Sequence, residues 1–276
     1  MTLAEQFQRD SQEFRSRILR LGNEEVSRYY WYHTISLPGG LVTPGVYDFR
    51  SSLPCFQFPQ DMRGMSVLDV GSATGFFAFE LERRGALVTS VETPSLEALD
   101  RFPGQTVEQS VEKIQKMIGV GHPKYTAEEL YRYLLDGPFE FCRNLLNSKV
   151  ERCFSSVYDV PAKLGNRTFD LVFMGDILLH TLYPLQALAA VTPLCKGRLV
   201  LSQVMPEAPD GQPAMQYVGG DDPVADEICW WLPNQACMAQ LLKKLGFREV
   251  REVGRNTGQL RPSGYPYDRP ILHAIR

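Results

Sequence analysis

The chain has 276 residues, which is enough for one large domain with a full buried core. Hydrophobic residues make up 44% and charged residues 22%, a globular composition that excludes disordered and fibrous classes. The formal net charge of −3 provides no overall positive field for a nucleic acid, which makes such a partner unexpected. No apolar run reaches the roughly eighteen residues of a membrane span, so we expect a soluble protein without a membrane partner.

Targeting and metal signals are also missing from the sequence. The start, Met1–Asp10, lacks the basic and then apolar layout of a secretory signal, which predicts a cytoplasmic location. The six cysteines form no C-x-x-C pair, so we expect neither a zinc site nor a redox motif, and no metal.

The N-terminal segment, residues 1–62, is predicted to form a helix followed by an aromatic lid. Apolar residues recur there at helical spacing, namely Leu3, Phe7, Phe14, Ile18 and Leu21, so this stripe must be buried on the rest of the chain or, in a homodimer, on a second copy. Residues 31–50 are aromatic and rich in turns, as loops that cover a site often are. Their candidate substrate contacts are Trp31, Tyr32 and Tyr47.

The most informative stretch is residues 67–77, where an apolar strand enters a glycine-containing loop and then a helix. The next apolar strand ends in Glu92, whose carboxylate is placed to accept hydrogen bonds from ribose hydroxyls. A dinucleotide loop needs a central glycine for its pyrophosphate, and this loop has Ala73 there. Asp69 just upstream would face a cationic group. The loop therefore predicts a single nucleoside that carries an ammonium, the alternatives being another Rossmann ligand or a chance glycine turn.

This spacing resembles the D-x-G-x-G-x-G motif of class I S-adenosylmethionine-dependent methyltransferases, departing from it only at Ala73. The resemblance implies an enzyme with S-adenosyl-L-methionine as its cofactor. It places Asp159 where that family hydrogen-bonds adenine, although Asp159 also suits the cap of a short helix near Pro161. The expected cofactor-binding residues are Asp69, Gly71, Ser72, Ala73, Gly75, Glu92, Thr93, Tyr158, Asp159 and Gly175.

Strand and helix patterns alternate through residues 63–276, which predicts an α/β fold with a doubly wound, mostly parallel sheet. With a closing antiparallel pair it would be the seven-stranded, Rossmann-like sheet of the methyltransferases. The expected strands are 67–70, 87–91, 152–157, 169–174, 198–204, 247–253 and 270–275, and the helices 75–84, 177–190 and 234–245.

Two segments exceed what this sheet needs. Residues 94–148 contain further helical patterns and predict a helical insertion, while residues 205–233 form a proline- and glycine-rich cap. Both follow carboxyl ends of strands, where ligands bind in open α/β sheets, so we expect both to cap the active site.

Two histidines are candidate catalytic residues. His180 follows the fourth parallel strand and would act as a base near neutral pH, or else hold the opening loop in place. His33 stands among aromatic residues, where it would contact ligand or simply pack. Of Trp230 and Trp231, one is expected in the core and the other at an aromatic acceptor.

The W-Y-H-T and T-P-G motifs, residues 31–34 and 43–45, resemble a methyltransferase group related to tRNA wobble-uridine carboxymethyltransferase. Those enzymes carry tyrosine before the histidine, where this chain has Leu179, and a lysine-rich segment before the glycine motif. Residues 31–62 contain no lysine and only Arg50. An extra cofactor carboxylate would lack partners, which favours plain S-adenosylmethionine.

The leading hypothesis is therefore a methyltransferase that acts on an oxygen or nitrogen of a small-molecule acceptor, aromatic or sugar-like. One alternative is a tRNA wobble-uridine (carboxy)methyltransferase. The other is a non-catalytic S-adenosylmethionine-binding partner subunit, in which side chains would fill the acceptor cleft.

Overall fold

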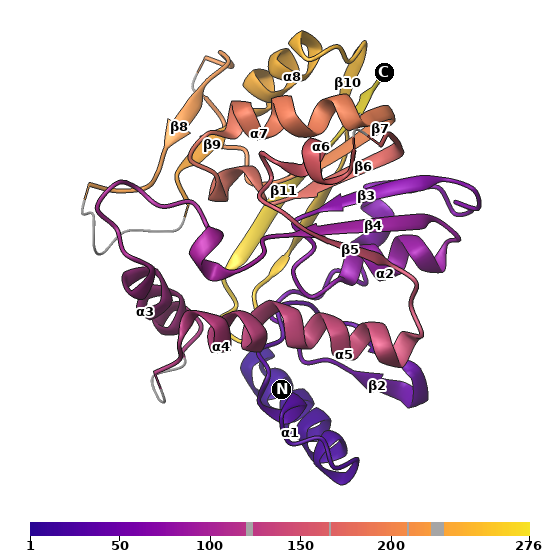
Figure 1. Ribbon diagram of the computed structural model, residues 1–276, viewed down its shortest axis with the longest axis vertical. Helices are drawn as coiled ribbons and strands as arrows, with labels where there is room; N and C mark the ends of the chain where they lie inside the picture. The colour runs from indigo at the N-terminus through magenta and orange to yellow at the C-terminus, as the bar shows by residue number, and fades with distance from the viewer. Residues whose placement is uncertain (120–123, 166, 209, 222–228) are drawn as a thin grey trace.

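The computed structural model describes residues 1–119, 124–165, 167–208, 210–221 and 229–276. Its centre is a seven-stranded sheet in the order β10-β11-β7-β6-β3-β4-β5 (Figure 1). The five strands from β7 to β5 pair in parallel, while β11 runs antiparallel to both β7 and β10. This is the predicted doubly wound α/β sheet with its antiparallel terminal pair. The strands are β3 (Ser66–Val70), β4 (Leu87–Glu92), β5 (Glu151–Phe154), β6 (Phe169–Gly175), β7 (Cys195–Ser202), β10 (Glu249–Gln259) and β11 (Pro266–Ile275).

Helices cover both faces of the sheet and enclose two cores (Figure 1). On one face Phe77 and Phe139 join Phe173 of the sheet, and on the other Leu188 and Met238 join Val172. The sheet residues are apolar on both sides because both sides are buried. The helices are α2 (Phe76–Arg83) and α5 (Gly137–Leu146) on the first face, and α6 (Val160–Lys163), α7 (Pro184–Val191) and α8 (Gln235–Lys244) on the second.

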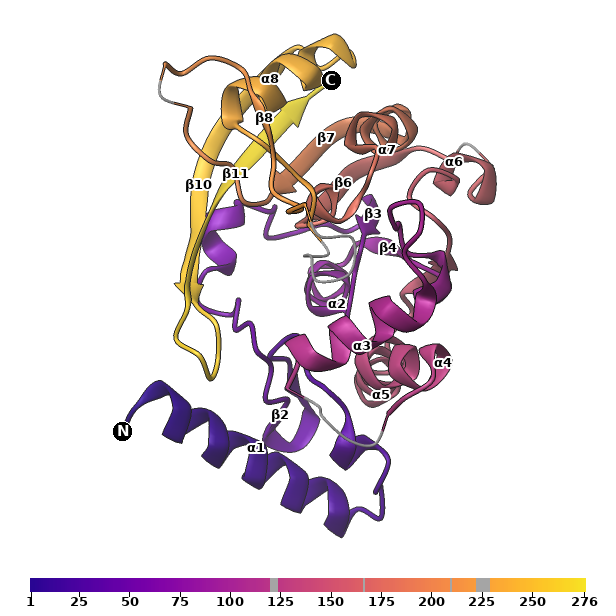
Figure 2. The ribbon, with the colours of Figure 1, turned by 90° about the vertical axis from the view of Figure 1, so that its left-hand side faces the viewer.

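Helix α1 (Leu3–Arg20) packs its apolar stripe on its own chain. Phe14 and Ile18 are buried in the first core, and the Phe14 ring lies 5.1 Å from that of Trp31. Leu21, which was expected in the stripe, follows the last helical residue and is 72% exposed. The β10–β11 hairpin reaches this helix (Figure 2), where Arg261 pairs with Asp10 at 3.0 Å. The short elements between α1 and β3 are η1 (Val26–Arg28), β1 (Ser36–Leu37), η2 (Pro38–Gly40), β2 (Leu41–Val42) and η3 (Leu53–Phe56).

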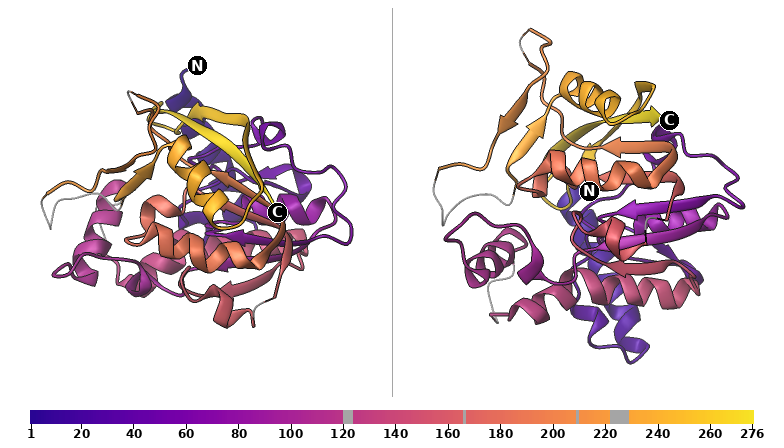
Figure 3. Two further views of the ribbon diagram at one scale, coloured as in Figure 1. Left: turned by 90° about the horizontal axis from the view of Figure 1, so that it is seen from above. Right: turned by 45° about the horizontal axis from the view of Figure 1, so that its top comes forward.

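The segment between β4 and β5 forms helices with a small apolar cluster of their own. Arg152 of β5 fastens it to the sheet by pairing with Asp136 at 3.1 Å and lying over the Phe139 ring at 4.0 Å. Its elements are η4 (Leu96–Ala98), α3 (Val107–Met117), α4 (Ala127–Tyr131) and the π-helical η5 (Arg132–Asp136), which runs into α5. Figure 3 shows α3 and the β8–β9 hairpin on one side of the molecule, beyond the carboxyl ends of the parallel strands.

Several predicted elements need correction. The helix expected over 177–190 is split into the turn η6 (Leu178–His180) and α7, because Thr181 is extended and Pro184 cannot continue a helix from before it. The strand expected over 152–157 ends at Phe154. The final two strands are longer than predicted and form one hairpin.

The cap holds a hairpin that the sequence did not predict, β8 (Met215–Tyr217) with β9 (Trp231–Pro233). Residues 209 and 222–228 of this cap lie outside the described residues, as do residues 120–123 of the insertion. No helix in the described ranges is both long and apolar enough to cross a bilayer.

Replacing Gly75 by alanine tests the packing of the glycine loop on α5. Gly75 has φ +92°, and an added Cβ would lie 2.5 Å from Phe79 and 2.8 Å from Phe139. We expect Gly75→Ala to lower the free energy of unfolding by at least about 3 kcal/mol, since a left-handed backbone and overpacking both contribute. Urea denaturation measures this.

The matched control is Gly64→Ala, because Gly64 has φ +79° but open space around its Cβ position. It should cost only about 1 kcal/mol, the backbone part of the penalty. Equal losses in the two variants would show that the Phe79 and Phe139 contacts are unimportant.

Candidate active site

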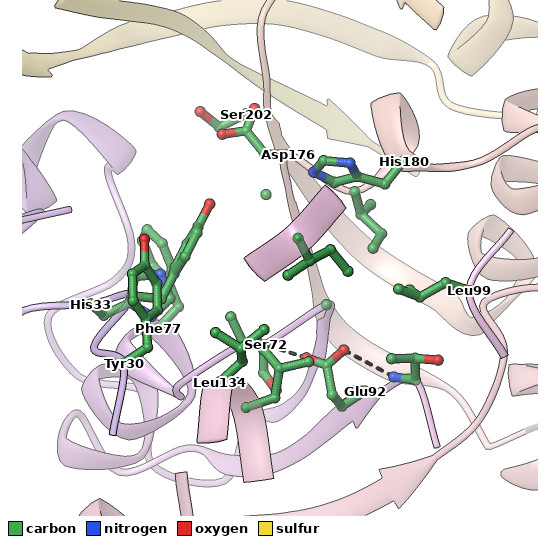
Figure 4. Close-up of a pocket in the computed structure, with 18 of the residues that line it drawn as sticks. Tyr30, His33, Ser72, Phe77, Glu92, Leu99, Leu134, Asp176, His180 and Ser202 are labelled. Carbon is green, nitrogen blue, oxygen red and sulfur yellow. Dashed lines mark hydrogen bonds between the residues drawn. The ribbon is translucent and has the colours of Figure 1, made fainter. Parts of the chain in front are cut away.

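Two adjoining cavities open at the carboxyl ends of the parallel strands. The larger has a volume of about 270 Å³ and extends past β3, β4, β6 and β7 (Figure 4). The smaller, of about 80 Å³, lies toward β5. The residues that line both, and so stand where the two spaces meet, are Gly71, Glu92, Thr93, Leu99, Asp100, Ile177 and His180.

The loop after β3 has left-handed backbone at alternate positions. Gly71, Ala73 and Gly75 have φ of 77°, 47° and 92°. Ala73 thus adopts the conformation for which a glycine is usual, at a cost of about 1 kcal/mol. This turn directs the Ala73 amide to a Glu92 carboxylate oxygen at 2.7 Å.

Like Asp100, Glu92 lines both cavities. Its second oxygen accepts the Thr93 amide at 2.9 Å. Burial raises the pKa of this carboxyl, while the Thr93 and Ala73 amides and the Arg152 charge oppose that rise. Each carboxylate oxygen has capacity for a further donor, so the pair of oxygens suits two neighbouring hydroxyls.

Asp69 was expected to face a cationic ligand group, and the structure places it elsewhere. It is 1% exposed, lines neither cavity, and interacts with the backbone amide of Ala78 in the first turn of α2. A helix N-terminus favours a carboxylate, but burial and then the Glu92 charge raise the pKa of Asp69 to about 7. Gly75 likewise lies behind the loop, outside both linings.

The smaller cavity is bounded by the loop after β5. Tyr158 lines it, and its hydroxyl donates to the Asp100 carboxylate, which also accepts the Leu182 amide at 2.7 Å. Asp100 therefore joins three segments across this cavity, a role that no local sequence pattern indicated. Asp159 is exposed, lines neither cavity, and stands at the start of α6 without a side-chain capping bond. The structure brings Tyr158, and not Asp159, to the site.

The two candidate histidines differ in character. His33 lines the larger cavity among aromatic rings, and its amide donates to Thr74 Oγ1 of the glycine loop at 3.2 Å. Burial lowers the pKa of His33 to about 3, so its ring is neutral and too weak a base to take a proton near pH 7. His180 ends η6, is half-buried, and has Nδ1 3.6 Å from the Cys229 sulfur.

The aromatic acceptor candidates separate into two groups. Tyr32 and Trp230 line the larger cavity. Trp31 is buried in the first core, and Trp231 donates to the Leu182 carbonyl oxygen at 3.2 Å. Tyr47 stands behind the wall, where its hydroxyl accepts from Arg269 at 3.2 Å.

Sequence reasoning missed a polar group at the far end of the larger cavity. Asp176, Ser202, Asn256 and Arg269 all line it. Asp176 follows Gly175 at a strand end and was open to recognition, whereas Asn256 and Arg269 lie in the terminal hairpin, where no local pattern marks them. Within the described residues, no group of three or more His, Cys, Asp or Glu is arranged to hold a metal ion.

Solved structures share the fold of this chain. The N-terminal domain of EvdMO1 with SAH bound superposes with a TM-score of 0.53 at 15% identity, covering 93% of this chain and 95% of that one. The chain has a Rossmann-like methyltransferase fold. A magnesium protoporphyrin IX methyltransferase from Synechocystis PCC 6803 with bound SAM also matches, with a TM-score of 0.44 at 15% identity over 82% of this chain and 76% of that one.

Sequence comparison adds little to this methyltransferase fold. No family model matches the chain. A tRNA U34 carboxymethyltransferase of Idiomarina loihiensis is 28% identical over 93 residues, which are 33% of this chain and 28% of that protein. The match thus spans less than a third of the relative.

The burial of Asp69 predicts a pH-dependent stability. The ordinary pKa of an aspartate, 3.8, applies to the unfolded chain, and burial raises the pKa of Asp69 to about 7 in the fold. Between these two pH values the folded state therefore holds one more proton than the unfolded state. The free energy of unfolding therefore falls as pH rises, by up to about 1.4 kcal/mol per pH unit, and levels off above the folded pKa. Urea titrations at pH 5, 6, 7 and 8 measure the slope.

Asp69→Asn removes this proton while keeping an oxygen for the Ala78 amide. The variant should show a shallower decline of stability between pH 5 and 7 than the parent protein. Parallel pH profiles for the two proteins would contradict the raised pKa.

Proposed function

We propose that this protein is an S-adenosylmethionine-dependent methyltransferase acting on an oxygen or nitrogen of a small molecule. The observation that carries the proposal is the Glu92 carboxylate, fixed by the Ala73 and Thr93 amides where two cavities meet. A nucleoside whose ribose binds there has one space for its base and another for its remaining half.

The residues around this point suit such a cofactor. Glu92 accepts the ribose hydroxyls, and Tyr158 bounds the space for adenine. The other half of the cofactor extends past Ser72, Ala73 and Gly175, which line the larger cavity. Asp69 does not contact the cofactor in this arrangement. It supports the first turn of α2 through the Ala78 amide.

When bound, S-adenosylmethionine supplies a methyl group already activated on a sulfonium. The protein's task is then to hold the acceptor atom in line with that methyl group, and orientation accounts for much of such a rate. His180 lines both cavities and is the candidate base for an acceptor that must lose a proton. The open volume beside the loop is the feature that a non-catalytic subunit was expected to lack.

Charge favours a small acceptor over RNA. Among the described residues that line the larger cavity, the one arginine or lysine is Arg269, and it is already paired with Asp176. RNA binding relies on several cations that contact phosphates. The described lining of the larger cavity therefore does not carry the several cations expected of an RNA site.

Removing the Glu92 carboxylate should abolish tight cofactor binding. Two hydrogen bonds to a charged acceptor disappear in Glu92→Ala, so we expect the affinity for S-adenosylhomocysteine to fall by about 100-fold or more. Isothermal titration calorimetry measures this. The control Glu249→Ala removes an exposed carboxylate of β10 and should bind like the parent protein. A parent protein that does not bind the ligand would refute the proposal.

The RNA alternative has a separate test. In a gel-shift titration at about 50 mM salt, where phosphate contacts are strong, we expect no shift of bulk tRNA by the purified protein. A shift that weakens steeply with added salt would instead favour the tRNA-modifying alternative.

A further inference from the structure

Four polar side chains line one part of the larger cavity, and Figure 4 shows two of them, Asp176 and Ser202, at the end away from Glu92. They come from four places in the chain, namely the turn after β6, the end of β7, and the strands β10 and β11. Each has one buried atom without a hydrogen-bond partner among the described residues. These atoms are Asp176 Oδ1, Ser202 Oγ, Asn256 Oδ1 and Arg269 Nη1.

Such unpaired atoms are costly in a folded protein, and four in one cavity point to a ligand that supplies the missing partners. Ser202, Asn256 and Arg269 are each more than nine-tenths buried. Asp176 adds a second sign of function, because its backbone has φ 47°, a left-handed conformation that is uncommon outside glycine and is often found at functional sites.

The charge of this end selects the chemistry of the ligand. Arg269 Nε donates to Asp176 Oδ2, so the two charges already cancel. The Arg269 guanidinium is further held by the Tyr47 hydroxyl at 3.2 Å and lies 4.8 Å from the Tyr267 ring centroid. A ligand carboxylate would meet the Asp176 charge, and a ligand cation would meet the Arg269 charge. An uncharged group fits both.

The free atoms also define a hydrogen-bond pattern. Asp176 Oδ1 and Asn256 Oδ1 accept, whereas Arg269 Nη1 donates and Ser202 Oγ can do either. A hydroxyl satisfies this pattern, since it donates one hydrogen and accepts at its oxygen. The adjoining walls are aromatic, from Phe49, Phe56, Phe77 and Phe173.

We infer that Asp176, Ser202, Asn256 and Arg269 form the head-group subsite of the methyl acceptor and bind an uncharged hydroxyl carried by an aromatic ring. The hydroxyl hydrogen is donated to Asp176 Oδ1, and its oxygen accepts from Arg269 Nη1. The inference rests on the proposed function, because it takes the opposite end of the cavity as the cofactor's place.

Three fluorinated probes of equal ring size test the subsite. In ¹⁹F NMR titrations of protein saturated with S-adenosylhomocysteine, 4-fluorophenol should bind about tenfold more tightly than 4-fluoroanisole, which cannot donate, or 4-fluorobenzoate, which is charged. Equal affinities for the three probes, or a preference for the benzoate, would overturn the inference.

Asp176→Asn provides a sharper result, because it leaves the buried Arg269 charge without its partner. The preference should then invert, with 4-fluorobenzoate binding about tenfold more tightly than 4-fluorophenol. The matched control is Asp268→Asn on the same hairpin, where the carboxylate pairs with Arg255 in an exposed position. It should keep the parent preference, and an unchanged preference in Asp176→Asn would overturn the inference.

Two further outcomes separate this inference from its premise. A loss of S-adenosylhomocysteine affinity in Asp176→Asn that matches the loss in Glu92→Ala would assign the cluster to the cofactor's amino acid end and overturn the inference. If the parent protein does not bind S-adenosylhomocysteine at all, the proposed function fails, and the probe preference of the free protein still decides the subsite.

If Asp176→Asn does not fold, a second variant replaces it. Asn256→Leu should lower the affinity for 4-fluorophenol about tenfold, and an unchanged affinity would count against the subsite.

Discussion

A pair of hydrogen bonds, from the Ala73 and Thr93 amides to the Glu92 carboxylate, is the constraint on which the site depends. It holds the loop after β3 against the end of β4 and keeps Ala73 in a left-handed conformation. It also fixes a buried carboxylate beside Asp69, whose pKa rises in part through that neighbour. The free protein thus holds two acidic groups close together in a buried place, and a ligand that donates hydroxyl hydrogens to Glu92 relieves part of that cost.

The far end of the cavity follows the same logic with different groups. There the buried charges of Asp176 and Arg269 cancel, but their remaining atoms lack partners. Most of the remaining lining is apolar, with Phe77 and Phe173 among its aromatic residues. A cavity with polar ends and an apolar middle favours two ligands that meet in the middle, each held by its polar end. Such an arrangement suits the methyl transfer proposed above.

The sheet and the cofactor loop could be predicted because their signals are local: apolar runs, glycines, and Glu92 at a strand end. The helix expected over 177–190 was wrong because Pro184 interrupts it, a local signal that the apolar pattern outweighed. The direction of the Asp69 side chain depends on how α2 packs over β3, which spacing does not give. Arg269 was missed because its partner Asp176 is 93 residues away in the chain.

Three segments cover the cavity: the N-terminal aromatic segment, the helical insertion and the cap. They explain why the proposed methyl donor is easier to predict than the acceptor. Hydrogen bonds tie each of them to a loop at the cavity, among them those from the His33 amide to Thr74 Oγ1, from the Tyr131 hydroxyl to the Thr93 carbonyl oxygen, and from the Trp230 amide to the Leu179 carbonyl oxygen. The donor end is built by strand termini, whose geometry the sheet dictates. The acceptor walls come from covers and a terminal hairpin that the sheet leaves free to vary, so their chemistry emerges only when distant segments are assembled.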